Sequence, residues 1–237
     1  MPRKKVIKIL KQIKINFEKF LEFNDYNTID TRIYIKKENK YKKLERYNKL
    51  IVLENEVKNC RKCDLGNSRL HTVFGEGSEK AKLMFIGEGP GYEEDHIGIP
   101  FVGKSGKLLN NIIASIGFTR KEVYITNIVK CHPMLDKANP DRRNNDRAPY
   151  NTEIKNCMYY LNEQIKIINP KIIVTLGKSA TKGLLNIKEN ISTIRGNIKY
   201  YQQIMVIPTY HPAALLRNIN LKKYVWRDMK KIKKILG

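Results

Sequence analysis

Short apolar runs alternate with helical patterns from residue 82 to the end of the chain. Four runs have the length and composition of buried parallel strands: 82–88, 123–129, 171–177 and 203–209. Segments of helical periodicity lie between and after them, at 107–117, 151–168, 179–185 and 220–236. Because strands alternate with helices, we predict an α/β fold, a three-layer α/β/α sandwich around a four-stranded parallel sheet.

The first 45 residues differ from the rest, with more than twice as many basic as acidic side chains and no glycine. Apolar residues recur there at spacings of three and four, which predicts a basic amphipathic helix: Val6, Leu10, Ile13, Phe17 and Phe20. The polar run at 34–43 predicts a linker or a short helix start. We therefore expect a basic helical extension at 1–45 and a main domain at 46–237. The extension is either an arm that holds DNA or directs targeting, or a solvated helix on the main domain.

The net charge of +23 favours a polyanionic partner such as nucleic acid. Most of the basic residues are lysines, an excess that an AT-rich genome also produces. No run is long and apolar enough to span a bilayer, and the N-terminus lacks the apolar core of a secretory signal. We expect an intracellular monomer without a membrane partner; organelle targeting by the extension stays open.

The stretch GIPFVGKSG at 98–106 spells the P-loop pattern G-x-x-x-x-G-K-S. A working P-loop follows a strand directly, but here three carboxylates precede it, Glu93, Glu94 and Asp95. Pro100 also removes a backbone N–H that a phosphate cradle would use. The spelling is therefore interpreted as a coincidence inside another kind of site.

Polar side chains gather where the predicted strands end. The loop GEGPGYEED follows the first strand, Asn127 lies in the second, and His211 follows the fourth. Because ligands bind at the carboxyl ends of parallel strands, we expect one crevice lined by Glu88, Glu94, Phe101, Asn127 and His211. Taken singly, each has an ordinary alternative as a cap, a surface histidine or a core aromatic.

Four cysteines, Cys60, Cys63, Cys131 and Cys157, include one C-x-x-C pair. Without a secretion signal they favour a metal or cluster site over disulfides. Ligation by thiolates alone suits zinc as well as iron–sulfur, so the spacing leaves that choice open.

An ordered set of segments resembles the family 4, iron–sulfur type of uracil-DNA glycosylase. It comprises CRKCDLGNSR at 60–69, GEGPGYEED at 87–95, GIPFVGKSGKLL at 98–109, TNIVKCHP at 126–133, NCMYYL at 156–161 and PTYHPAALLR at 208–217. The resemblance implies hydrolysis of the N-glycosidic bond of flipped-out uracil in single- or double-stranded DNA, which starts base excision repair. The alternative is a catalytically weak or inactive DNA-binding or replication accessory protein with the same fold.

The resemblance also implies residue roles. Phe101 stacks on the extruded uracil, Asn127 reads its Watson–Crick edge, and His211 donates a hydrogen bond to its O2 atom. Glu88 and Glu94 are the candidate carboxylates for the water and the cation-like sugar. Chemistry of this kind needs the base outside the duplex, because the bond cannot be reached inside it.

Further contacts follow from the same resemblance. Gly89 stands in the base pocket, and Tyr92 or Glu94 is the candidate for crowding the C5 position of thymine. Leu215 or Leu216 inserts where the base left, unless these leucines are core, and Arg217 contacts phosphates.

The four cysteines are implied to bind a 4Fe–4S cluster with a structural role, zinc being the alternative. The segment LDKANPDRR at 135–143 departs from the family pattern as an insertion beside the site, within reach of DNA.

Overall fold

The protein is described by a computed structural model that covers residues 31–237, with side chains from Leu44 onward. The helix expected at Val6–Phe20 lies outside the described residues. Residues Glu45–Gly237 form one compact unit. Within the described range, no helix combines the length and apolarity needed to cross a membrane.

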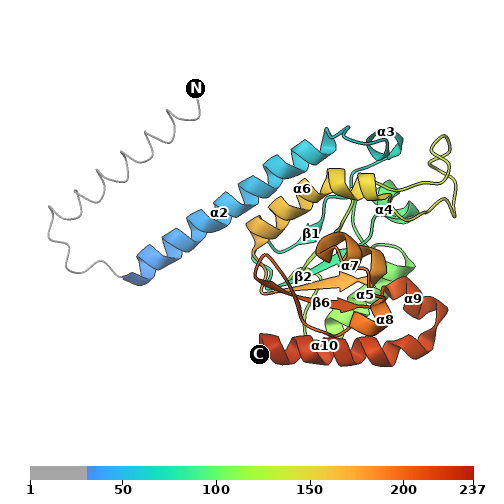
Figure 1. Cartoon of the computed structure of the whole chain (residues 1–237). Coiled ribbons are helices and arrows are strands. Elements are labelled where there is room, and N and C mark those ends of the chain that lie inside the picture. Colours follow the sequence, from blue (N-terminus) through green and yellow to red (C-terminus); the bar gives the residue numbers. More distant parts are fainter. Residues whose placement is uncertain (1–30) are drawn as a thin grey trace, which may run out of the picture. The chain divides into compact units, whose positions relative to one another are not determined.

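The centre of this unit is a mixed sheet of six strands in the order β1-β3-β2-β4-β6-β5 (Figure 1). The strands are β1 (Glu76–Gly77), β2 (Leu83–Gly87), β3 (Tyr124–Asn127), β4 (Ile172–Leu176), β5 (Lys199–Tyr201) and β6 (Ile204–Thr209). The four central strands are parallel, as predicted, and β1 and β5 add antiparallel edges. These two edges were not predicted because strands of two or three residues carry no periodicity.

Helices and short turns make up most of the remaining described chain. They are α2 (Thr31–Lys58), α3 (Leu65–Ser68), α4 (Tyr92–Ile97), α5 (Lys104–Ser115), α6 (Asn151–Ile168), α7 (Gly177–Leu185), α8 (Ile191–Ile194), α9 (Pro212–Arg217), the 3-10 turn η1 (Ile219–Leu221) and α10 (Lys222–Leu236). Of the two alternatives for 34–43, a linker or a short helix start, the linker is wrong, because that run lies inside the 28-residue helix α2. Its lysines and glutamate are good helix formers, and it contains no glycine or proline to end a helix.

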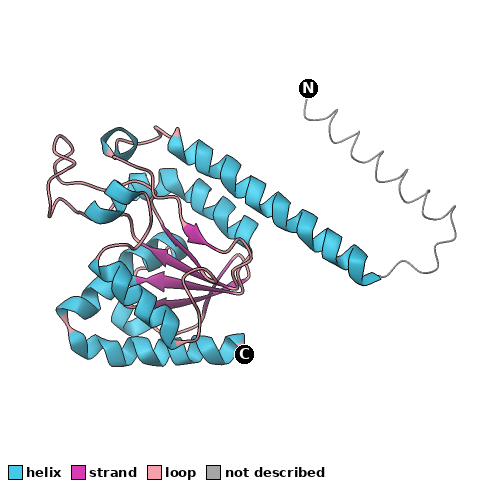
Figure 2. Ribbon diagram, turned by 180° about the vertical axis from the view of Figure 1, so that it is seen from behind, coloured by secondary structure: helices cyan, strands magenta, loops and turns pink. Residues whose placement is uncertain are grey.

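The sheet is covered on both faces, which explains the continuous apolar runs of its strands. Along β2, Leu83 and Phe85 join a core cluster with residues of α5 and α10, while Met84 and Ile86 join one with residues of α6 and α7. This alternation is the period-two geometry of a strand. Seen from both sides, the sheet lies between α6 and α10 (Figures 1 and 2), so the predicted three layers are confirmed.

The connections at the carboxyl ends of the parallel strands place the site. The turn from β4 into α7 uses Gly177 at φ 88°, a backbone conformation that favours glycine. A Cβ at Gly177 would lie 2.9 Å from the Cβ of His211, which follows β6. The missing side chain at Gly177 therefore lets the histidine loop approach the middle of the sheet.

Candidate active site and cysteine cluster

Three of the expected residues meet at the carboxyl edge of the sheet. A Cβ on Gly87 would lie 2.3 Å from Asn127 Oδ1 and 2.5 Å from Phe101 Cζ. The ring centroids of Phe101 and His211 are 5.7 Å apart at an interplanar angle of 35°. An aromatic ring, an amide and an imidazole from three separate chain segments therefore surround one small region beside Gly87.

Asn127 ends β3 and is 1% exposed. Its Oδ1 atom is buried and has no hydrogen-bond partner within the described part of the chain. An unpaired buried acceptor costs about 1–3 kcal/mol, and such atoms are rare in folded proteins. The placement favours a ligand that brings its own N–H or O–H donor to this oxygen.

Phe101 adopts an unusual backbone conformation, with φ 53°, and is 6% exposed. A non-glycine residue in this region is strained and persists only where its surroundings hold it. Arg120 supplies much of that hold: its guanidinium donates to the carbonyls of Phe101, at 3.2 Å, and Pro100. The Arg120 Nε atom in turn donates to Glu76 at 2.6 Å, which fixes the arginine to strand β1.

Glu94 is bonded to the protein through both carboxylate oxygens. Oε1 accepts from the backbone N–H groups of Val102 at 2.9 Å and Gly103 at 3.0 Å, and Oε2 accepts from that of Gly91 at 3.2 Å. The carboxylate thus caps α4 and holds the Phe101 loop at the same time. Glu94, which was expected to act on substrate, thus already accepts three backbone hydrogen bonds.

Glu88 is the remaining candidate carboxylate, directly after β2. It is half-buried, and burial raises its pKa above the usual value, while a hydrogen bond from Ser179 opposes this shift. Ser179 lies in the first turn of α7, so it orients the carboxylate at the edge of the sheet.

His211 is the N-cap of α9, and its Nδ1 atom accepts from the backbone N–H of Ala213 at 3.1 Å. Burial lowers the pKa of His211 to about 4, and the charge of Arg217 acts in the same direction. The ring is therefore neutral near pH 7. Because Nδ1 is an acceptor, the proton of the neutral ring is on Nε2, which is free to donate.

Gly89 and Tyr92 take less direct positions. A Cβ on Gly89 would lie 2.8 Å from Val129 Cγ2, so the loop has no room for a side chain there. The Tyr92 ring lies 4.1 Å from the ring of His96 and under the guanidinium of Arg143 at 4.8 Å. Tyr92 is thus covered by the inserted loop as well as by its own helix.

The two leucines of α9 are in different environments. Leu215 is 2% exposed and belongs to the core cluster with α5 and α10, whereas Leu216 is 52% exposed. One of these leucines was expected to insert into DNA unless both are core; Leu215 is a core side chain, and Leu216 is not. Leu216 and the exposed Arg217 are the side chains of this helix available to DNA.

The insertion at 135–143 braces two neighbouring segments. Asp141 binds His96 of α4 at 3.0 Å and Arg143 binds Glu93 of the same helix at 3.3 Å. Lys137 binds Asp64, the residue after Cys63, at 2.8 Å. The loop therefore joins the helix that carries Tyr92 to the segment that carries the first cysteine pair.

All four cysteines are free, and they lie near one another. Burial raises the pKa of Cys131 to about 12, and the neighbouring Cys63 and Cys157 add to this shift. Burial also raises the pKa of Cys63 and of Cys157, with contributions from Cys60 in both cases. Across residues with described side chains, no three His, Cys, Asp or Glu form a site for a single metal ion.

Several N–H groups point at the sulfur atoms. Arg69 Nη1 donates to Cys131 Sγ at 3.1 Å. The backbone N–H of Lys130 donates to Cys157, and Cys63 accepts from the backbone N–H groups that follow it. Such N–H···S contacts stabilise thiolates and tune iron–sulfur centres, so the donor set suits a thiolate-ligated cluster.

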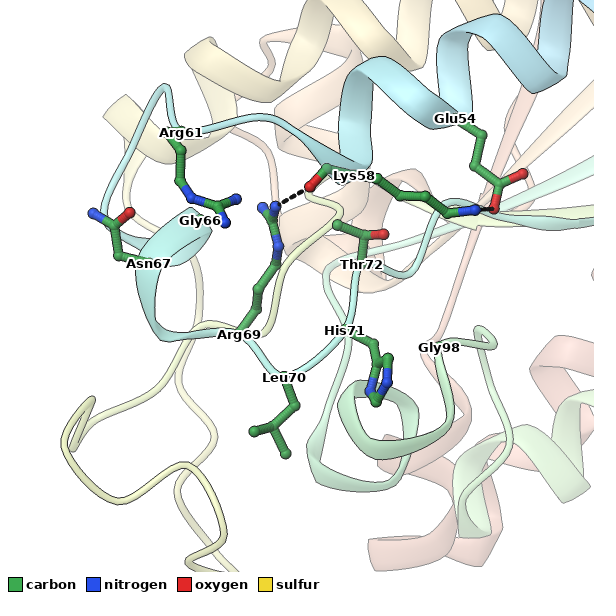
Figure 3. Close-up of a pocket in the computed structure, with 10 residues that line it drawn as sticks. All are labelled: Glu54, Lys58, Arg61, Gly66, Asn67, Arg69, Leu70, His71, Thr72 and Gly98. Carbon is green, nitrogen blue, oxygen red and sulfur yellow. Dashed lines mark hydrogen bonds and ion pairs between the residues drawn. The ribbon is translucent and has the colours of Figure 1, made fainter.

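A surface cavity of about 440 Å³ lies between the end of α2 and the residues that follow the first cysteine pair (Figure 3). Its basic side chains are already engaged: Lys58 binds Glu54 at 3.1 Å, and Arg69 donates to the carbonyl of Lys58 at 2.7 Å. The cavity is distinct from the region around Asn127, and nothing in its lining selects a ligand.

Three side chains near the site carried no usable signal in the sequence: Arg120, Ser179 and Lys130. Arg120 bonds to Phe101, 19 positions away, and Ser179 bonds to Glu88, 91 positions away. The residues next to Arg120 and Ser179 in the chain form no pattern that predicts these contacts. Lys130 lies within the segment TNIVKCHP, but only its burial shows that it belongs to the site.

Comparisons with known proteins agree with this geometry. The family model described as "Uracil DNA glycosylase superfamily" matches residues 74–230. The chain is 47% identical over 192 residues to a type-4 uracil-DNA glycosylase of Sulfurisphaera tokodaii, covering 77% of this chain and 83% of that one. It is 44% identical over 197 residues to the type-4 enzyme of Saccharolobus solfataricus, covering 79% and 87%. Phe101, Asn127 and His211 meet at one edge of the sheet, and the family model matches most of the domain around them. This chain therefore belongs to the uracil-DNA glycosylase superfamily.

Proposed function

We propose that this protein excises uracil from DNA by hydrolysing its N-glycosidic bond, the first step of base excision repair. The observation that carries the proposal is the convergence of Phe101, Asn127 and His211 around an unpaired buried amide oxygen. Curated relatives at 40–47% identity carry the name type-4 uracil-DNA glycosylase. The alternative of an inactive accessory protein is not favoured.

Selectivity for uracil follows from the hydrogen-bonding pattern of one amide. The Asn127 Oδ1 atom accepts from N3–H of uracil, and its NH₂ group donates to O4. Cytosine presents an acceptor and a donor in the reverse order, so its entry leaves buried polar groups unpaired. The Phe101 ring stacks on the extruded base and fixes its plane.

Bond cleavage moves the C1′–N1 electron pair onto the base. The neutral His211 ring donates from Nε2 to uracil O2 while negative charge develops there, as an oxyanion-hole donor does. The Glu88 carboxylate faces the cation-like sugar and orients the water that attacks C1′, which yields an abasic site and free uracil. Glu94 holds the Phe101 loop, and Gly89 lets the loop after β2 pack against Val129 beside the base pocket.

We further propose that Cys60, Cys63, Cys131 and Cys157 bind a 4Fe–4S cluster. When bound, it supplies iron–thiolate bonds that join three chain segments, and hydrolysis needs no redox step. The N–H···S contacts and the loop bond between Lys137 and Asp64 support this assignment.

DNA contact is assigned to the surface around α9 and the basic helix α10. Leu216 takes the place of the extruded base, and Arg217 with the lysines of α10 binds phosphates. The high net charge supports a polyanionic partner of this kind. The protein acts as an intracellular monomer, with residues 1–45 as a basic extension of a 46–237 glycosylase domain.

The test is direct. Purified protein loaded with iron and sulfide is incubated with single- and double-stranded oligonucleotides that contain one uracil, and alkali-labile sites are counted. Matched oligonucleotides with thymine or cytosine at the same position are the controls. The proposal predicts cleavage at uracil alone; intact uracil strands after prolonged incubation with cluster-loaded protein would refute it.

A further inference from the structure

Lys130 is a fully buried lysine three residues after Asn127. Its side chain is 0% exposed, and its Nζ atom donates to Thr126 Oγ1 at 2.6 Å and to the carbonyl oxygen of Asn127 at 2.7 Å. Both acceptors are neutral. Burial lowers the pKa of Lys130 to about 7, and the acidic thiols of Cys157 and Cys131 act in the opposite direction.

The main chain of Lys130 is fixed on the opposite side. Its N–H donates to the sulfur of Cys157, and its carbonyl accepts from the N–H of Val73 at 2.8 Å. The next residue is Cys131, a second cluster ligand in the proposed function. One residue therefore contacts two of the cysteines through its backbone and the base-reading Asn127 through its side chain.

A buried ammonium is costly, because removing its hydration is offset only by good hydrogen bonds and nearby negative charge. A leucine or methionine would fill similar space without that cost. In this position the cation has two uses: thiolates that ligate a metal centre carry negative charge beside it, and its N–H groups fix the Asn127 peptide.

Thr126 closes this arrangement from the other face of β3. Its hydroxyl, which accepts from Lys130, donates to the Phe74 carbonyl at 2.8 Å and lies 3.3 Å from Gln164 Oε1. The ammonium therefore stands on a fixed support, and the Asn127 carbonyl is held in one orientation relative to the sheet.

We propose that Lys130 is a positioning residue that couples the cysteine cluster to the uracil-reading amide of Asn127. The inference rests on the proposed function and adds a residue to it. Loss of this side chain leaves Asn127 in place but free to turn, and it removes a cation that retains the cluster.

The variant that tests this is Lys130→Met, which keeps the length of the side chain and removes its donors and charge. Lys171→Met is the matched control, because Lys171 is exposed and precedes β4, at the amino ends of the parallel strands and away from the site. We expect Lys130→Met to slow single-turnover uracil release by about tenfold or more per loaded protein, and Lys171→Met to leave it unchanged.

A double-mutant cycle shows whether the effect passes through Asn127. If Lys130 acts by positioning this amide, Lys130→Met costs less than about threefold once Asn127 is alanine. Equal losses in both backgrounds would overturn the coupling. So would a Lys130→Met enzyme as fast as the wild type.

Cluster retention gives a readout independent of activity. Iron loss to EDTA, followed by visible absorbance and iron content, is expected to be faster in Lys130→Met than in Lys171→Met; equal rates would overturn the cluster half of the proposal.

Lys130→Gln separates the two roles if the methionine variant does not fold. Its amide can still donate to Asn127, so uracil release recovers while iron loss stays fast, and no recovery would argue against positioning. Wild-type protein that releases no uracil would instead refute the proposed function itself.

Discussion

Replacing His211 by alanine removes the imidazole at the base site and the side-chain cap that it gives to α9, which lowers stability by about 1 kcal/mol. The Nδ1 atom of His211 accepts a backbone N–H, and burial lowers its pKa to about 4, so the ring works as a neutral Nε2–H donor. The charge it stabilises exists only as the glycosidic bond breaks. His211→Ala is therefore expected to act on the chemical step far more than on DNA binding.

The size of the effect follows from the role. Removing one oxyanion-type donor costs about 3–4 kcal/mol, which corresponds to roughly 10²- to 10³-fold in rate. Ground-state contacts of His211, such as its ring contact with Phe101 at 5.7 Å, are weak by comparison. Affinity for a uracil-containing strand should change by less than about threefold.

The assay pairs single-turnover uracil release with fluorescence anisotropy on an oligonucleotide that carries a non-hydrolysable uracil nucleotide. His71→Ala is the control, because His71 is exposed and bonds only to the Asp95 carbonyl through its ring. Equal losses of rate and affinity in His211→Ala would contradict the donor role. A rate within threefold of the wild type would contradict it as well.

The remaining predictions concern packing, the loop and pH. Leu216→Ala should slow release from duplex DNA with little change in stability, whereas Leu215→Ala should lower the free energy of unfolding by about 2–5 kcal/mol; urea unfolding and duplex kinetics compare the two, and the opposite pattern would reverse the assignment. Arg120→Ala frees the Phe101 loop, so kcat/KM should fall about tenfold in steady-state assays, and an unchanged value would show that the loop holds itself. The lowered pKa of His211 means that the folded protein binds fewer protons than the unfolded chain between about pH 6.5 and 4. As the pH is lowered from about 6.5 to 4, the free energy of unfolding should therefore decrease more in the wild type than in His211→Ala. A difference between the two free energies that does not depend on pH would argue against the lowered pKa.

Local pattern was enough to predict the layers of the fold. The buried runs of β2, β3, β4 and β6 and the periodic helices α5, α6 and α10 are signals carried by neighbouring residues. The polar run inside α2 misled because polarity was taken for the absence of structure, although lysine and glutamate favour helices. The edge strands β1 and β5 are too short to show any pattern.

Placement of the site residues required contacts that no local pattern encodes. Asn127 and His211 were found because they end or follow a strand, and Phe101 because it lies in a segment that resembles the family pattern. The segment alone left open whether Leu215 or Leu216 inserts into DNA or both are core, and the packing of α9 against α5 decides which of the two is buried. Glu94 carries the right chemistry for catalysis, and only its three backbone partners show that it is already occupied.

The shared carboxylate of Glu94 has a consequence for how a base is admitted. Because it ties Gly91 to Val102 and Gly103, the loop that is proposed to receive the base is already held in place in the protein without DNA. Because this loop is already ordered, little conformational entropy is lost there when the base binds. The main free-energy cost of binding is then the unstacking of the base from the DNA. Strands whose bases are already unstacked, such as single strands and mismatches, are then the substrates that such a rigid slot processes fastest.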